Sequence, residues 1–136
     1  MNKEEMEKIG LIAGNRRLPI LFSEAAKKRN YYIVAVAIKG EASYKLRKYV
    51  DKIYWVSINS FLRLSEIFKA EGITKVVMAG QISPYRLFSK EVYKSEELKN
   101  LLASIKDKRA DTIFGAIAEK LKMWGFELLD SPTFIE

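Results

Sequence analysis

The sequence contains no cysteine and no histidine. Disulfide bonds, zinc–thiolate centres, and nucleophiles or general bases of either residue type are therefore excluded within this chain. A metal site here would need oxygen ligands, which suit Mg²⁺. Acid–base chemistry would fall to Asp, Glu, Lys or Tyr.

Long apolar runs are also missing, and no leader segment is expected. No apolar run reaches the roughly 18 residues that a membrane-spanning helix needs, and residues 1–5 are too polar and acidic for a signal peptide. We therefore expect a cytoplasmic protein. The 136 residues, of which 49% are hydrophobic and 30% charged, are enough for one domain with a sizeable core.

Positive charge is in excess, because 24 Lys and Arg face 17 Asp and Glu and give a net charge of +7. Such an excess favours acidic partners, which include nucleotides, phospholipid surfaces and nucleic acid. Much of the charge is Lys on predicted helix faces, for which solvation is the plainer interpretation. Basic residues are not visibly concentrated with stacking aromatics, so no nucleic-acid partner is expected.

Apolar segments alternate along the chain with amphipathic, helix-like segments. The predicted strands are 8–13, 31–38, 53–56, 73–79 and 126–129. The predicted helices are 19–29, 59–70, 95–105 and 111–124, with a short basic helix or loop at 42–50. This alternation predicts an α/β fold, a Rossmann-like, doubly wound and mainly parallel sheet of about five strands with helices on both faces.

Five residues mark predicted helix ends. Pro19 is tolerated in the first turn of a helix. Asn59 or Ser60 fits an N-cap. Gly72 and Gly125 fit helix stops, since glycine readily adopts the backbone conformation that ends a helix.

The carboxyl ends of the strands are where a doubly wound sheet gathers its functional residues. The first of these ends lies at a helix start, where backbone N–H groups favour an anion. Glycine permits close approach of a ligand, and arginine is shaped for bidentate phosphate contact. A simple turn is the competing interpretation of the glycines. The candidate substrate-binding residues are Gly14, Asn15, Arg16, Lys39, Gly40, Gly80, Gln81, Asp130 and Ser131.

The first turn does not carry a dinucleotide fingerprint. Gly10 and Gly14 lack the required spacing, and Arg16 stands where a later glycine would be. Lys39, rather than an acidic residue, closes the second predicted strand. The chain also has no Walker sequence, so neither an NAD site nor a phosphate-loop ATPase is expected.

Four stretches of the chain match one family in order: Ile9–Pro19, Val36–Ala42, Val76–Ile82 and Gly125–Ile135. Together they resemble the N-terminal domain of the LpxI family, the UDP-2,3-diacylglucosamine pyrophosphatases of lipid A biosynthesis. The resemblance covers nearly the whole chain. The sequence departs from the family pattern where Arg16 replaces the second glycine of a Gly-x-Gly turn and where Gln81 replaces a common lysine.

The resemblance implies a Mg²⁺-dependent hydrolysis of a UDP-linked lipid, in which water attacks the pyrophosphate and releases UMP and 2,3-diacylglucosamine 1-phosphate. It also implies a substrate held between two domains, with the metal-binding carboxylate in a C-terminal domain absent from this sequence. We therefore expect residues 1–136 to be one substrate-binding N-terminal domain that is nearly inactive alone and contacts the inner membrane at most peripherally. The alternative is a non-catalytic nucleotide-binding or interaction module, as a monomer or a homodimer.

Overall fold

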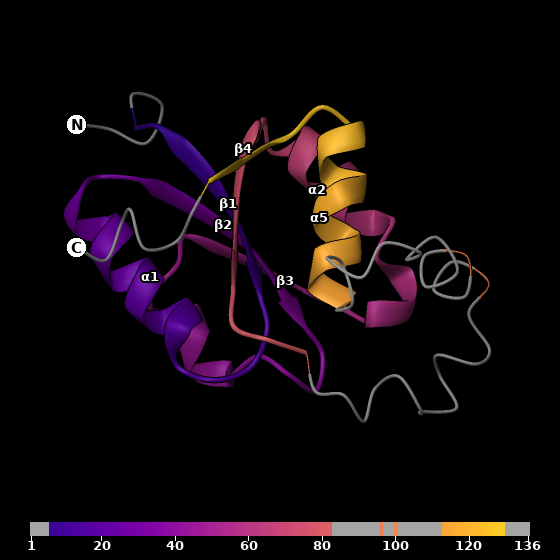
Figure 1. Cartoon of the computed structure of the whole chain (residues 1–136). Coiled ribbons are helices and arrows are strands. Elements are labelled where there is room, and N and C mark those ends of the chain that lie inside the picture. The colour runs from indigo at the N-terminus through magenta and orange to yellow at the C-terminus, as the bar shows by residue number, and fades with distance from the viewer. Residues whose placement is uncertain (1–5, 83–95, 97–99, 101–112, 130–136) are drawn as a thin grey trace.

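The computed structural model describes residues 6–82, 96, 100 and 113–129 (Figure 1). Five parallel strands form one sheet in the order β3-β2-β1-β4-β5. The strands are β1 (Lys8–Ala13), β2 (Tyr32–Ile38), β3 (Lys52–Val56), β4 (Lys75–Ala79) and β5 (Glu127–Leu129). The helices are α1 (Leu18–Lys28), α2 (Arg63–Ala70) and α5 (Ile113–Met123), with the short 3₁₀ helices η1 (Tyr44–Lys48) and η2 (Ile58–Ser60).

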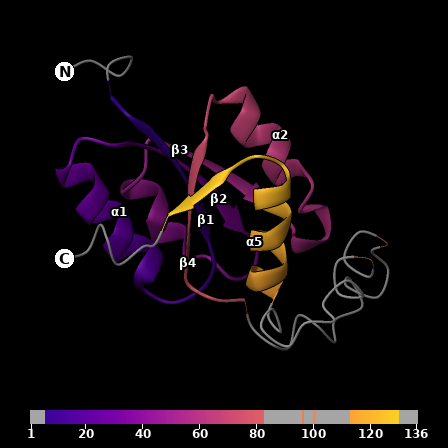
Figure 2. The same ribbon diagram turned by 45° about the horizontal axis from the view of Figure 1, so that its top comes forward.

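The sheet is covered on both faces, as the sequence predicted. α1 and η1 pack on one face, whereas α2 and α5 pack on the other (Figure 1). β5 lies at the edge of the sheet beside β4, and α5 immediately precedes it (Figure 2). The Rossmann-like fold class is confirmed.

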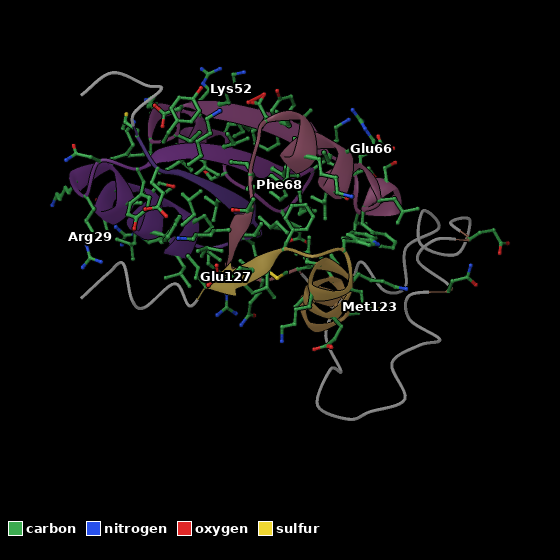
Figure 3. The ribbon with its side chains drawn as sticks, turned by 90° about the horizontal axis from the view of Figure 1, so that it is seen from above. Arg29, Lys52, Glu66, Phe68, Met123 and Glu127 are labelled. Atoms are coloured by element: carbon green, nitrogen blue, oxygen red, sulfur yellow. The ribbon has the colours of Figure 1, made fainter. Side chains whose placement is uncertain are left out.

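The central strands are apolar on both sides because helices cover both sides. All seven residues of β2 are buried, and so are five of the six in β1. Gly10 in β1 makes room for α2, since a Cβ there would fall 2.8 Å from the Phe68 ring. Phe68, labelled in Figure 3, in turn meets Phe126 edge to face, with 6.1 Å between ring centroids.

Helix ends follow the predicted turn residues at most positions. α1 holds Pro19 in its first turn and is followed by Asn30 at φ 64°. Gly72 and Gly125 follow α2 and α5 at φ 75° and 92°, values that suit glycine.

The predicted start of α2 is wrong. Residues Ile58–Ser60, which include both predicted caps, form the separate turn η2. The α-helix begins at Arg63 after Leu62, which makes no side-chain capping bond. Phe61 explains the difference, because it is buried and the chain turns into the core there before the helix starts.

Several predictions lie outside the described residues. These are most of the helix expected at 95–105, the first residues of the helix expected at 111–124, and the candidate residues Asp130 and Ser131. No helix in the described part of the chain is long and apolar enough to cross a membrane.

Candidate functional site

The carboxyl ends of β1 and β4 meet at the centre of the sheet. β1 pairs with β2 on one side and with β4 on the other. The chain leaves β1 toward α1 on one face and returns to the sheet after β4 through α5 on the other face. Such a reversal of strand order is where ligands bind in open parallel sheets.

The loops that follow β1 and β4 touch each other through their backbones. The Gly14 N–H donates to the Ala79 carbonyl at 2.9 Å, and the Asn15 N–H donates to the Gln81 carbonyl at 2.7 Å. A Cβ on Gly14 would lie less than 3.0 Å from backbone atoms of Gln81. A Cβ on Gly80 would do the same against Asn15. Contact between the loops therefore requires both glycines, whether or not a ligand approaches them.

Arg16 combines a charged side chain with an unusual backbone. Its φ is 70°, in the left-handed region where residues other than glycine are uncommon. The side chain is exposed, and α1 begins two residues later with no acidic residue in its first turn. The helix N-terminus and the guanidinium thus both offer positive charge at this edge of the sheet.

A side-chain contact joins the exit loop of β1 to that of β2. Asn15 Nδ2 donates to Glu41 Oε2 at 2.9 Å, while Asn15 Oδ1 is buried without a hydrogen-bond partner among the described residues. The sequence interpretation did not single out Glu41, although it lies inside one of the four matched stretches. Lys39 and Gly40, just before it, are exposed, and Gly40 adopts φ 82°.

The predicted site residues within the described chain lie at one edge of the sheet. Three exit loops, those of β1, β2 and β4, carry all of them. The members of this set, which we call the carboxyl-edge site, are Gly14, Asn15, Arg16, Lys39, Gly40, Gly80 and Gln81. Glu41 is the only acidic residue in the described parts of these loops, and its carboxylate is bonded to Asn15. The surroundings of the site therefore favour an anionic ligand.

The two tryptophans lie apart. Trp55 in the edge strand β3 packs against the exposed Tyr44, with ring centroids 4.9 Å apart. Trp124 is half-buried and stacks on Phe61 at 6.4 Å. Trp124 thus extends the core under α2 and α5.

A second polar cluster lies at the opposite, amino edge of the sheet. Glu71 accepts hydrogen bonds from the Tyr54 hydroxyl at 2.7 Å and from Lys52 Nζ at 3.0 Å, and Lys8 Nζ donates to the Glu71 carbonyl at 3.1 Å. The bonds from Tyr54 and Lys52 hold the pKa of the Glu71 carboxyl below its ordinary 4.5. The bond to Glu71 raises the pKa of Tyr54 and that of Lys52. The cluster ties the end of α2 to β3 and β1 and lies away from the carboxyl-edge site.

Carboxylates for a metal are lacking where the structure is described. No group of three Asp or Glu side chains in those residues could hold an ion. Glu41 is occupied by its bond to Asn15. These residues therefore do not fit a complete Mg²⁺ site.

Comparison with protein families gives a decisive match. Residues 8–136 match the LpxI N-terminal domain. The chain belongs to the LpxI family. Three of the four matched stretches run through the exit loops of β1, β2 and β4, so in this LpxI N-terminal domain the family resemblance converges on the carboxyl-edge site. No curated protein matches the sequence.

Solved structures share the fold of this LpxI domain at low sequence identity. An N5-carboxyaminoimidazole ribonucleotide synthetase from Thermotoga maritima is 17% identical over 96% of the chain, with a TM-score of 0.53. A UDP-glucose-4-epimerase from Stenotrophomonas maltophila is 12% identical over 93% (TM-score 0.55), and the Bordetella bronchiseptica enzyme WbmG is 15% identical over 96% (TM-score 0.55). The chain spans only 26%, 36% and 39% of these proteins, respectively.

Proposed function

We propose that this chain is the substrate-binding half of a hydrolase that cleaves UDP-2,3-diacylglucosamine to UMP and 2,3-diacylglucosamine 1-phosphate. The observation that carries the proposal is the family match over residues 8–136, together with the three matched stretches that run through the carboxyl-edge site. The pyrophosphate of the substrate is the group that this positively charged edge would hold.

The chemistry of the carboxyl-edge site suits a pyrophosphate. The Arg16 guanidinium can donate two parallel hydrogen bonds to phosphate oxygens. Lys39 adds a point charge on the neighbouring loop, and the N-terminus of α1 adds its dipole. Pro19 has no N–H, so the first turn of α1 offers one backbone donor fewer to the phosphates.

In this proposal the chain binds and orients the substrate but does not complete the catalytic centre. Family hydrolysis uses Mg²⁺, and the described residues do not fit a Mg²⁺ site. We therefore assign the metal ligands and the attacking water to a second domain. The 136-residue chain alone should then release no UMP from the substrate in the presence of Mg²⁺. Measurable release would contradict the assignment of the metal ligands to a second domain.

Binding can be tested on the isotope-labelled chain by NMR titration with short-acyl UDP-2,3-diacylglucosamine. We expect the amide signals of Gly14, Asn15 and Gly80 to shift. Arg16→Gly should weaken binding about tenfold or more, because a charge-assisted phosphate contact is lost. The same change should raise the free energy of unfolding by about 0.5–1 kcal/mol, since glycine relieves the left-handed backbone.

Lys69→Ala is the matched control. Lys69 is an exposed lysine in the last turn of α2, next to the amino-edge cluster, so its loss removes the same charge away from the site. Affinity in this variant should stay within about twofold of the parent. An equal loss in both variants, or unmoved signals at Gly14 and Gly80, would contradict the proposal.

A further inference from the structure

The net charge of this protein is concentrated in one part of the chain. Residues 16–51 contain nine Lys or Arg and three Asp or Glu, a net charge of +6, whereas the remaining residues contain 15 and 14, a net charge of +1. This segment folds into α1, β2 and η1, of which β2 is buried. The charge therefore lies on the face of the sheet that α1 and η1 cover and on the adjoining carboxyl edge.

Basic side chains on this face are mostly unpaired within the described part of the chain. Five of them form what we call the basic face: Lys27 and Lys28 in the last turn of α1, and Lys45, Arg47 and Lys48 in η1. Only Lys27 forms an ion pair, at 2.7 Å from Asp51.

Elsewhere the described lysines are more often neutralised. Lys52 pairs with Glu71 at 3.0 Å, and Lys75 pairs with Glu7 at 2.7 Å. Lys122 lies 3.7 Å from Glu119. Arg29 and Glu66 project from opposite sides of the molecule (Figure 3), one at the end of α1 and the other on α2. Unpaired positive charge is thus concentrated on one side of the described part of the molecule.

The basic face is hollowed and carries apolar projections. A cavity of about 550 Å³ opens between α1 and η1 and is lined by Glu24, Lys27, Lys28, Lys48, Tyr49 and Val50. Leu21 is 43% exposed and Tyr44 is 77% exposed. Leu21 lies seven residues before Lys28, so both occupy the same side of α1.

We infer that the basic face docks on the surface of a bilayer containing anionic phospholipids, with headgroup phosphates entering the cavity and Leu21 and Tyr44 resting at the interface. Unpaired lysines near an anionic leaflet are attracted to it, and an aromatic ring with a hydroxyl suits the boundary between water and lipid. The exposed Leu21 favours lipid over nucleic acid, since a phosphate backbone offers it no apolar partner. The inference rests on the proposed function in one respect: a lipid-linked substrate would be presented at that surface.

Docking in this way would bring the site to its substrate. The basic face continues to the carboxyl edge, where Arg16 and Arg17 precede α1. Leu21 lies in the first half of α1 and Tyr44 opens η1 just beyond β2, so both apolar projections lie toward that edge rather than the amino edge. A diacylated substrate could therefore keep its acyl chains in the bilayer while its pyrophosphate reaches Arg16.

Co-sedimentation of the full 136-residue chain with vesicles tests the inference. We expect binding to vesicles of phosphatidylglycerol and phosphatidylcholine at about 0.05 M salt, little binding to phosphatidylcholine alone, and strong weakening at about 0.5 M salt. The double variant Lys28→Glu/Lys48→Glu should lower the partition coefficient at least about tenfold. Leu21→Ser/Tyr44→Ser should lower it at both salt concentrations, because insertion of apolar groups is not screened.

Lys69→Glu/Lys122→Glu is the matched control, with the same change in net charge on the α2–α5 face. The partition coefficient of this variant on anionic vesicles should stay within about threefold of that of the parent. Equal losses in the two charge variants, absence of binding to anionic vesicles, or tighter binding of labelled RNA than of vesicles through the same lysines would each overturn the inference. Circular dichroism checks that every variant is folded.

The two proposals fail separately. Vesicle binding needs no substrate, whereas the titration at Gly14 and Gly80 needs no bilayer. Loss of vesicle binding with intact substrate shifts would remove the docking surface and leave the proposed function. The reverse result would remove the proposed substrate and leave a lipid-binding surface.

Discussion

The backbone of Gly14 lies against that of Gln81, and the backbone of Gly80 lies against that of Asn15. Each loop can take its position only because neither glycine carries a Cβ. Loops at the carboxyl edge therefore hold their shape without a ligand. A preformed loop loses less conformational freedom on binding, which favours affinity.

Gly80→Ala should lower the free energy of unfolding by about 3 kcal/mol, as measured by urea denaturation. The added Cβ meets backbone that cannot move away easily, and the alanine must also adopt φ 87°. Gly125→Ala is the control, since Gly125 has φ 92° but nothing within 4 Å of a Cβ. Its cost should be about 1 kcal/mol, and equal costs would show that loop contact contributes nothing.

Arg16 is the residue at which local preference and the observed backbone disagree. An arginine at φ 70° is strained, and glycine would be accommodated there without strain. The backbone of this turn is one that glycine would adopt freely, and arginine adds a positive charge to it. Strain that a sequence retains at the proposed substrate-binding edge points to a role for the side chain.

At the scale of elements, hydrogen bonds of Glu71 connect the end of α2 to the sheet. Glu71 follows the last residue of α2, and its carboxylate receives donors from two positions of β3. Only 13% of the side chain is exposed. The ionised form is stabilised in the folded protein, which is why its pKa is lowered.

Acid should therefore weaken the fold through Glu71. The contribution of a carboxyl with a lowered pKa is fully present above its unfolded value of 4.5 and is lost as pH falls through the folded pKa. Glu71→Gln should lower the free energy of unfolding by about 1 kcal/mol at pH 7. Urea denaturation from pH 7 to pH 3 should show the difference between the variant and the parent shrinking.

Glu66→Gln on the exposed side of α2 controls for the loss of one negative charge. Its difference from the parent should stay small across the same pH range. Tyr54→Phe removes one donor to Glu71 and should flatten the pH dependence in part. A Glu71→Gln difference that does not change with pH would mean that the carboxylate is not stabilised by folding.

Sequence periodicity predicted the strands well because buried parallel strands are apolar on both faces. Helix starts were harder to place: Asn59 and Ser60 have good capping side chains, yet burial of Phe61 delays α2 to Arg63. The cluster of Lys52, Tyr54 and Glu71 could not be predicted, since its members meet only after α2 packs on the sheet.

At the scale of the whole molecule, the strands of the sheet are unequally protected from solvent. β1 has a strand on each side and helices over both faces, whereas β3 and β5 lie at the edges. Amide hydrogen exchange followed by NMR should therefore be slowest in β1 and about tenfold or more faster in β5. Equal protection of β5 and β1 would contradict the unequal stability.

The carboxyl-edge site could be predicted from the sequence only in outline. Strand ends and the family resemblance identified Gly14, Arg16 and Gly80, because parallel strands bring their carboxyl ends to one edge. The bond between Asn15 and Glu41 was not foreseen, since it depends on how two loops turn. The basic face was missed because α1 and η1 are separated by a buried strand, and their lysines gather only in the fold.

The central pairing of β1 with β4 also sets an order of assembly during synthesis. In the sheet, Lys8 of β1 pairs with Tyr32 of β2, and Gly10 of β1 pairs with Val76 of β4. A chain growing from its N-terminus can therefore complete the β1–β2–β3 half while one side of β1 still lacks its partner. Until the ribosome has released β4, that open strand edge is the place where a nascent chain could pair with another molecule.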